Sequence, residues 1–261
     1  MDFDSLLNGR AVSPGVYTID FPDGWKQGRG LFGGLVIGAL VRQAEHHAQA
    51  VDRQARSVTA ELVGPAQAGP TEIRVRTLRA GNAVSTIAAE LIQAGETFAH
   101  AVVVFGATRP VDADFSEAMP PEAPAWQSLE PFPPDVPFVP EFAKNFEFRN
   151  VGPAPYSAGL EALASGWVRP RTCSRASAAY VVAQADAWWP SFFTRMSAPR
   201  PIGTIAFSLQ LTGALPEGDA PLFHRGRTTI CHAGYATEQR ELWTETGKLV
   251  SLNQQTIAII K

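Results

Sequence analysis

Asp186 is the residue of this sequence best suited to chemistry, because it lies within a stretch of mostly apolar side chains. Residues 176–196 read ASAAYVVAQADAWWPSFFTRM, and their apolar residues cover most of the surface of the helix that this pattern predicts. No basic residue lies one turn away from Asp186 on either side. A buried carboxylate without a hydrogen-bonding partner is costly. The helix therefore has to bring Asp186 against polar groups from elsewhere in the chain.

Pro190 follows Asp186 by four residues and cannot donate a hydrogen bond to the Asp186 carbonyl. We expect the helix to bend there, which leaves both the backbone and the side chain of Asp186 available for polar contacts. From this helix alone, a structural carboxylate that caps a distorted turn or bonds a neighbouring strand stays an open alternative.

The elements that would position Asp186 occur twice along the chain. In the first half, a strand at 16–21 and the glycine-rich stretch 28–34 precede a helix, and period-two patterns predict strands at 57–64, 71–78, 83–93 and 98–106. In the second half, strands at 145–151 and 159–168 precede the Asp186 helix, and strands are expected at 203–213, 221–232, 235–245 and 249–260. This is an internal duplication. We expect the four strands of the first half to form an antiparallel meander around its helix, which makes the fold class α+β.

A proline-rich segment separates the halves. Residues 109–140 contain nine prolines, a density that prevents regular structure and predicts an extended connector. Trp126, Phe132 and Phe138 indicate that the connector lies against the surface of the protein. The expected organisation is an N-terminal unit at 1–108, a linker at 109–141 and a C-terminal unit at 142–261.

The two halves differ at positions where polar residues replace apolar ones. If the turn glycines Gly95 and Gly247 are equivalent, Val103 of the first half corresponds to Gln255 of the second. Gln254 and Gln255 must point to opposite faces of their strand, so one of them is expected inside. Thr204 opens the strand that follows the Asp186 helix. Because unpaired buried polar groups cost about 1–3 kcal/mol each, a mutually bonded cluster is the better interpretation.

The helix of the first half starts with nearly bare backbone at Gly33 and Gly34. Glycines at this place allow a ligand or another side chain to approach the free N–H groups of the helix start. Neither a GxxxxGK[ST] nor a GxGxxG pattern is present, which argues against a phosphate loop. Tight packing of helix on sheet is an equally good interpretation of this segment alone.

The composition excludes several classes of function. A net charge of −3 and 18% charged residues give no electrostatic case for nucleic acid or for an anionic membrane surface. We expect no membrane span and no signal peptide, and hence a cytoplasmic protein. Cys173 and Cys231 are too few and too isolated for a disulfide framework or a zinc site, and the neighbours His46 and His47 point in different directions, so no metal site is expected.

The sequence resembles the TesB-like acyl-CoA thioesterases, a family with a double hotdog fold. In the first half the resemblance rests on Gly-Arg-Gly-Leu-Phe-Gly-Gly at 28–34, which opens a helix. In the second half it rests on Ala185-Asp186, on Thr204 within Gly203-Thr204-Ile205, and on Gln255 in the last strand. The resemblance covers nearly the whole chain. It implies two tandem helix-wrapped units that form one continuous sheet, and hydrolysis of fatty acyl-CoA by a water that Asp186, Thr204 and Gln255 activate.

The same resemblance implies further roles. Backbone N–H groups at Gly33 and Gly34 would stabilise the oxyanion, and no metal, covalent nucleophile or cofactor beyond the coenzyme A of the substrate is required. The acyl pocket would be lined by Trp188, Trp189 and Phe192, although ordinary core packing also explains each of them. The candidate contacts for the coenzyme A phosphates are Arg29, Arg169, Arg171, Arg195 and Arg200. Sheet edges in such folds often pair between chains, so a homo-oligomer, a dimer or tetramer, is expected.

Other interpretations compete with the hydrolase. Ser174 and Ser177 are typical of helix caps, and neither lies in a GxSxG nucleophile elbow. A hotdog hydratase would need an Asp-x-Asn-Pro-x-His signature, which the sequence lacks. The alternative of a different class is a non-catalytic acyl-CoA or fatty-acid binding protein that keeps the fold without turnover.

Overall fold

The computed structural model describes residues 2–49, 52–136, 139–217 and 219–260. The helices are α1 (Phe3–Leu6), α2 (Gly33–Ala48) and α3 (Ala178–Ala187), with short 3-10 helices η1 (Trp126–Ser128), η2 (Glu141–Asn145) and η3 (Ser191–Arg195). The strands of the first half are β1 (Arg10–Ser13), β2 (Val16–Phe21), β3 (Lys26–Gln27), β4 (Gly30–Leu31), β5 (Arg53–Leu62), β6 (Gly69–Ala80), β7 (Val84–Gln93) and β8 (Glu96–Ala107). Those of the second half are β9 (Phe146–Asn150), β10 (Leu163–Pro170), β11 (Ile202–Leu211), β12 (Leu222–His232), β13 (Tyr235–Trp243) and β14 (Leu249–Ile259).

Within the described ranges, twelve strands form one continuous antiparallel sheet in the order β1-β2-β6-β7-β8-β5-β11-β14-β13-β12-β10-β9. The order is symmetric about the central pair β5–β11, since each strand that the first half contributes to this sheet has a counterpart at the same distance on the other side. Strands β3 and β4 pair separately with each other. Even the irregularities repeat: a bulge lies between Ala55 and Ser57 in β5, and another between Thr204 and Ala206 in β11. The predicted duplication and the double hotdog fold are therefore confirmed.

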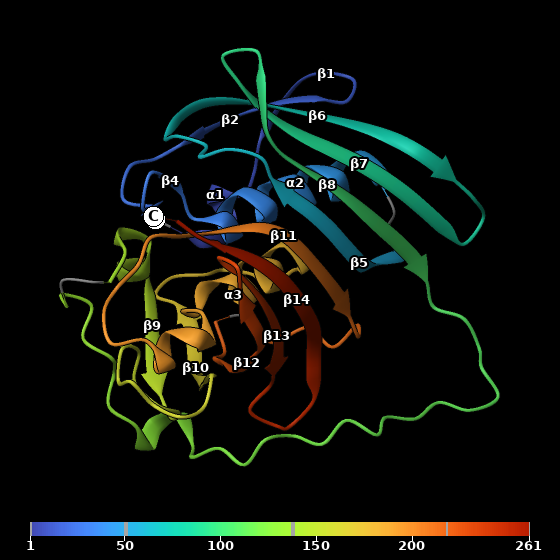
Figure 1. The fold of residues 1–261 in the computed structure, drawn as a ribbon. Helices are drawn as coiled ribbons and strands as arrows, with labels where there is room; N and C mark the ends of the chain where they lie inside the picture. Colours follow the sequence, from blue (N-terminus) through green and yellow to red (C-terminus); the bar gives the residue numbers. More distant parts are fainter. Residues whose placement is uncertain (1, 50–51, 137–138, 218, 261) are drawn as a thin grey trace.

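Helices α2 and α3 pack against each other inside the curved sheet (Figure 1). Glycines let them approach closely. A Cβ added at Gly34 would stand 2.7 Å from the Ala183 carbonyl oxygen, and one at Gly38 would stand 3.2 Å from that of Ala179. These two contacts run in opposite directions along the helices, so α2 and α3 are antiparallel. The start of each helix consequently lies beside the later turns of the other.

The predicted meander of the first half is wrong at one strand. Strands β6, β7 and β8 follow one another, but β5 pairs with β8 and with β11 instead of with β6. The connection between β5 and β6 leaves the sheet, because the Leu31 N–H donates to the Ala66 carbonyl over 2.7 Å and Gly30 packs against Pro65. This arrangement leaves the second edge of β5 free to join the two halves.

The prediction of one bent helix from 176 to 196 is also wrong. Helix α3 ends at Ala187, Trp188 is extended, and the chain forms the separate 3-10 helix η3 after Pro190. Proline restricts the residue before it to extended backbone and cannot donate to the Asp186 carbonyl. Asp186 thus lies in the last turn of a short helix and not in the middle of a long one. At the other end, Ser177 caps α3 as predicted, whereas Ser174 bonds Asp2.

Within its described residues, the linker contains the 3-10 helix η1 and ends at the first residue of η2, and it runs along the outside of the sheet between β8 and β9 (Figure 1). Trp126 is 5% exposed and Phe132 packs against Trp189, so the predicted contact with the surface is confirmed for both. Phe138 lies outside the described residues. Within the described part of the chain, none of the helices has the length and apolar character needed to cross a membrane.

Candidate active site

The three polar residues predicted to cluster are joined by hydrogen bonds. Asp186, in the last turn of α3, is 6% exposed. Gln255, from β14, donates from Nε2 to Asp186 Oδ1 over 3.1 Å. Thr204, from β11, donates from Oγ1 to Gln255 Oε1 over 3.1 Å. The chain of bonds runs from hydroxyl through amide to carboxylate, and it fixes which end of the Gln255 amide faces each neighbour.

Of the two adjacent glutamines, Gln255 points inward and is 1% exposed, whereas Gln254 is exposed. The period of a strand requires this separation, and the structure decides which residue is inside. Asn253, two residues before Gln255 on the same face, accepts a hydrogen bond from Gln255 Nε2 over 3.0 Å. Its own Nδ2 donates to the Ser208 carbonyl over 2.8 Å. Asn253 thereby orients the amide that bonds Asp186.

The start of α2, which belongs to the first half, reaches Asp186 across the interface between the halves. A Cβ added at Gly33 would stand 2.8 Å from Asp186 Oδ2. A backbone hydrogen bond from Gly34 helps to stabilise the ionised carboxylate and to lower its pKa. The first N–H groups of a helix lack intrahelical partners, and the helix dipole favours negative charge there. Gly33 and Gly34 are therefore beside the predicted catalytic carboxylate, and glycine at 33 leaves room for it.

A buried arginine supplies the positive charge that the helix itself lacks. Arg240, from β13, is 2% exposed, and its Nη1 lies 4.0 Å from Asp186 Oδ1. The same Nη1 donates to the Ala185 carbonyl over 3.0 Å, which satisfies a carbonyl of the last turn of α3. Its Nε donates to Glu238 Oε1 over 2.7 Å. Glu238 is thus the nearer partner of Arg240, and Asp186 is the more distant one.

Glu238 is fully buried and fully bonded. Its Oε2 accepts from the backbone N–H of Ser191 over 2.7 Å and from Thr228 Oγ1 over 2.9 Å. Buried ions require such complete pairing, because removing one partner leaves an uncompensated charge. The network ties η3 and β12 to the arginine next to Asp186.

The equivalent positions of the first half are apolar. In the pairing of β13 with β14, Glu238 is opposite Gln255 and Arg240 is opposite Asn253. In the matching pairing of β7 with β8, Ile87 is opposite Val103 and Ala89 is opposite Ala101, and all four are buried. The polar site therefore exists in one half only.

The environment of Asp186 raises the pKa of its carboxyl to about 6. Burial is the largest cause, because desolvation disfavours the charged form, and the nearby Glu238 adds to it. Arg240, the amide of Gln255 and the Gly34 backbone act in the opposite direction. A carboxylate that ionises near neutral pH is suited to accept a proton during catalysis.

Comparison with protein families shows the class of protein to which the chain belongs. A model described as the acyl-CoA thioesterase N-terminal domain matches residues 21–106, and one described as the acyl-CoA thioesterase C-terminal domain matches residues 115–259. This chain belongs to the acyl-CoA thioesterase family. It is a thioester hydrolase. No curated protein sequence matches the chain.

Solved structures show the same fold along almost the whole chain of this thioesterase. A hot dog fold protein from Alicyclobacillus acidocaldarius has a TM-score of 0.90 at 22% identity, covering 99% of this chain and 98% of that one. The tesB protein of Mycobacterium avium subsp. paratuberculosis has a TM-score of 0.82 at 18% identity, with coverages of 99% and 98%. The acyl-CoA thioesterase II TesB2 of Mycobacterium marinum has a TM-score of 0.81 at 16% identity, also with coverages of 99% and 98%.

The aromatic residues predicted to line the acyl pocket of this thioesterase lie in two clusters, and Trp189 packs against both. Trp188 and Trp189 contact each other with tilted rings whose centroids are 4.6 Å apart, and Trp188 stacks on the buried His224 at 5.4 Å. Phe192 belongs to a separate cluster with Ile257, the residue paired with Thr204. Trp189 is partly exposed, whereas the other two are buried. Phe192 thus lies on the Thr204 side of the site. The two tryptophans come directly after the last residue of α3 in the sequence.

The five arginines predicted for coenzyme A differ in their availability. Arg169 is engaged, since it pairs with Glu147 at 3.1 Å and stacks over the Trp126 ring. Arg171 donates from Nε to the Lys144 carbonyl over 2.9 Å. The other three are exposed and form no ion pair within the described part of the chain: Arg29, Arg195 and Arg200. Arg29 lies four residues before Gly33, in the turn between β3 and β4, which makes it the candidate nearest in sequence to the helix start.

Sequence reasoning missed Arg240, Glu238 and Asn253. The available signal was the phase of alternation in β13, where Glu238 and Arg240 share a face with the buried Ala236 and Leu242. His224 was also missed. It is fully buried, its ring nitrogens have no hydrogen-bond partner among the described residues, and burial together with Arg240 lowers the pKa so that the ring is neutral.

Among the residues that the structure describes, no three His, Cys, Asp or Glu side chains are grouped closely enough to hold a metal ion.

Proposed function

We propose that this thioesterase hydrolyses fatty acyl-CoA to a free fatty acid and coenzyme A, with Asp186 as the general base for the attacking water. The observation that carries the proposal is the meeting of Asp186, Gln255 and Thr204 with the start of α2. It combines a carboxylate of raised pKa, a hydrogen-bonded amide and hydroxyl, and backbone N–H groups in one place. These are the parts that hydrolysis of a thioester by water needs.

The proposed reaction follows from these positions. Ionised Asp186 takes a proton from a water whose oxygen attacks the thioester carbonyl carbon. Gln255 and Thr204 hold the carboxylate and the water in the orientation for attack. The oxyanion of the tetrahedral intermediate is stabilised at the start of α2, first by the N–H of Gly33, because the Gly34 N–H bonds the Asp186 carboxylate. Collapse of the intermediate breaks the carbon–sulfur bond, and the proton held by Asp186 is available to the departing thiolate. No metal or additional cofactor has a part in this scheme.

The remaining assignments rest on position. Phe192, which packs with Ile257 beside Thr204, and the partly exposed Trp189 are proposed to contact the acyl chain. Arg29, Arg195 and Arg200 are proposed for the coenzyme A phosphates, because their guanidinium groups are exposed. Arg169 and Arg171 are weaker candidates, since other groups already engage them. The cytoplasmic location and the homo-oligomer stay predictions.

The test is release of free thiol from short, medium and long acyl-CoAs by the wild type and by Asp186→Asn and Gln255→Ala. Gln254→Ala is the matched control, because Gln254 is the exposed neighbour of Gln255 on the other face of the same strand. We expect Asp186→Asn to abolish turnover while binding of the acyl-CoA persists, Gln255→Ala to reduce turnover, and Gln254→Ala to leave it unchanged. Undiminished turnover in Asp186→Asn would show that this carboxylate is structural.

A further inference from the structure

A cavity of about 430 Å³ lies between the later turns of α2 and the start of α3. Its charged lining consists of Arg42, Glu45, Arg53 and Arg175, and its apolar lining includes Phe105 and Leu211. Asp186 is at the opposite end of α3. The cavity is therefore separate from the Asp186 site.

The symmetry of the fold relates this cavity to the Asp186 site. Gly34 lies against Ala183, and Gly38 lies against Ala179. A twofold axis exchanges these two contacts if each residue of α2 corresponds to the residue of α3 that is 145 positions later. The bulges of β5 and β11 show that Ala55 corresponds to Thr204, which is 149 residues later. With the same difference in residue number, Leu62 corresponds to Leu211. Leu62 lies against Gly33 in the Asp186 site, and Leu211 lines the cavity. The cavity is thus the second copy of the active-site position.

The second copy lacks the groups proposed for hydrolysis. By the same equivalences, Val41 stands in the place of Asp186, Ala55 in that of Thr204, and Val103 in that of Gln255. Without the carboxylate, hydroxyl and amide, this place has no group to activate water by the route proposed above. We therefore consider this place as a binding site.

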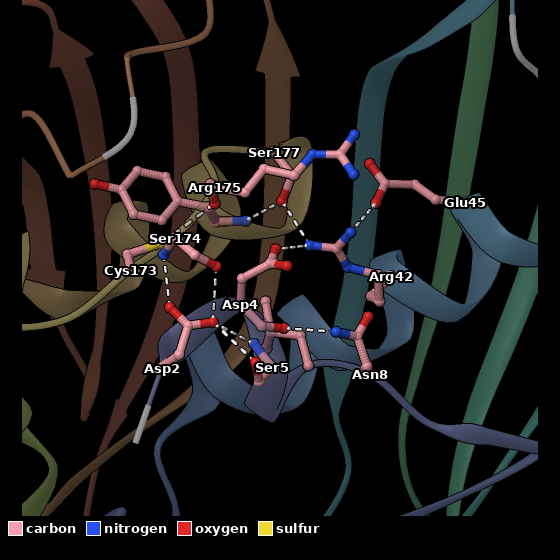
Figure 2. Close-up of polar contacts among 12 residues, drawn as sticks. Asp2, Asp4, Ser5, Asn8, Arg42, Glu45, Cys173, Ser174, Arg175 and Ser177 are labelled. Carbon is pink, nitrogen blue, oxygen red and sulfur yellow. Dashed lines mark hydrogen bonds and ion pairs between the residues drawn. The ribbon is translucent and has the colours of Figure 1, made fainter.

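Guanidinium groups line the cavity instead. Arg42 is 4% exposed, and among the described residues the Nε atoms of Arg42 and Arg53 are buried without a hydrogen-bond partner. Figure 2 shows the guanidinium groups of Arg42 and Arg175 and the carboxylate of Glu45 facing one another near Ser177. Ser177 caps α3, a helix of ten residues whose first N–H groups also favour an anion.

The charge balance limits the kind of anion. Arg42 is paired with Asp4 and lies 3.8 Å from Glu45. Two carboxylates therefore oppose the three guanidinium groups of Arg42, Arg53 and Arg175. Asp52 lies 3.7 Å from Arg53 Nε but is 74% exposed, so water screens it. Arg175 is exposed as well, so the charges of Arg42 and Arg53 are balanced by Asp4 and Glu45. Among the described residues, Arg175 is the guanidinium group of this cavity without an ion pair, and one such group fits a singly charged ligand better than a phosphate ester with two charges.

We propose that this cavity is a binding site for an amphiphilic monocarboxylate such as a medium-chain fatty acid. Its carboxylate bonds the guanidinium groups near the start of α3, and its alkyl chain lies against Phe105, Leu211 and Leu215. Burial of the alkyl chain and a charge-assisted hydrogen bond together supply the affinity. The site does not depend on hydrolysis at Asp186, because it shares none of the residues proposed for that reaction.

The test is isothermal titration calorimetry of the full chain with octanoate, with octanol and with octyl phosphate. We expect octanoate to bind, octanol to bind much more weakly, and octyl phosphate to bind more weakly than octanoate. Arg175→Gln should weaken octanoate binding by about tenfold, because it removes one charged donor. Arg175 is exposed, so this variant is expected to fold. Ala176→Phe, which fills the cavity, should abolish the same binding.

Two controls separate this site from the Asp186 site. Arg79→Gln removes an exposed arginine outside the cavity and should leave binding unchanged. Asp186→Asn should abolish turnover and leave this binding event in place. The proposal is overturned if octanoate does not bind, or if Arg175→Gln and Ala176→Phe both bind it as tightly as the wild type. Tighter binding of octyl phosphate that depends on Arg175 would overturn the choice of a monocarboxylate.

Discussion

Substitution of Gly33 by alanine should disable the enzyme without unfolding it. The added Cβ would stand 2.8 Å from both Asp186 Oδ2 and Leu62 Cδ1, whereas ordinary contacts begin near 3.4 Å. The carboxylate or the helix start must therefore move by about 0.6 Å, the difference between the two distances. A misplacement of about 1 Å can cost about a hundredfold in rate, so we expect kcat/KM to fall by about 10-fold to 100-fold. Stability should fall by less than about 2 kcal/mol, because the cost of overpacking is offset in part by the better helix propensity of alanine.

The assay compares thiol release with urea unfolding for Gly33→Ala and for Gly203→Ala. Gly203 is the matched control, because it neighbours Thr204 and an added Cβ meets nothing within 4 Å. We expect Gly203→Ala to keep wild-type turnover. Turnover of Gly33→Ala within threefold of the wild type would refute the argument that the reaction takes place where the start of α2 meets Asp186.

Further predictions concern the charges around the site. Because ionised Asp186 is the proposed base and its pKa is raised to about 6, kcat/KM should rise with pH up to about 6 and then level off; a flat profile from pH 5 to 7 would contradict this role. The same shift from 3.8 means that the contribution of Asp186 to the free energy of unfolding decreases as pH rises from about 4 to about 6, which pH-dependent urea titrations of wild type and Asp186→Asn can measure. Arg240→Met should move the acidic limb of the rate profile to higher pH and lower the free energy of unfolding by about 3–5 kcal/mol, because Glu238 is left buried and unpaired. Adding Glu238→Gln should recover part of that stability, and a double variant less stable than Arg240→Met would count against the pairing. Thr204→Val should lower turnover by about tenfold and the free energy of unfolding by about 1–3 kcal/mol, since it removes the hydrogen bond that orients the Gln255 amide and leaves the buried Gln255 Oε1 without a donor.

The hydrogen-bonded cluster of Asp186, Thr204 and Gln255 was predictable because each residue interrupts an apolar pattern. Burial of a lone polar group is unfavourable, so three such interruptions indicate a shared site. The pairing of Arg240 with Glu238 was not found in the same way. Charged residues in an antiparallel strand normally face water, and their burial becomes evident only when the face shared with Ala236 and Leu242 is known to be inside.

The positions of most strands were predictable from alternation, but their order was not. Alternation reports which face is buried and contains no information about which neighbour a strand pairs with. The place of β5 depends on a loop that bonds Leu31 and packs on Gly30, contacts between segments that are more than thirty residues apart. The end of α3 has a local cause, since Pro190 cannot donate to the Asp186 carbonyl and disfavours helical backbone at Trp189, so the helix ends instead of bending.

The sheet that continues through β5 and β11 joins two halves of one polypeptide whose sequences can differ. If the same architecture were assembled from two identical chains, every substitution would appear in both copies of the site at once. A change that helped one copy would then be imposed on the other. Tandem fusion removes this constraint, because α2 can keep its bare glycine start while α3 acquires the acid. One copy can therefore specialise in turnover while the other is free to become selective for a different ligand.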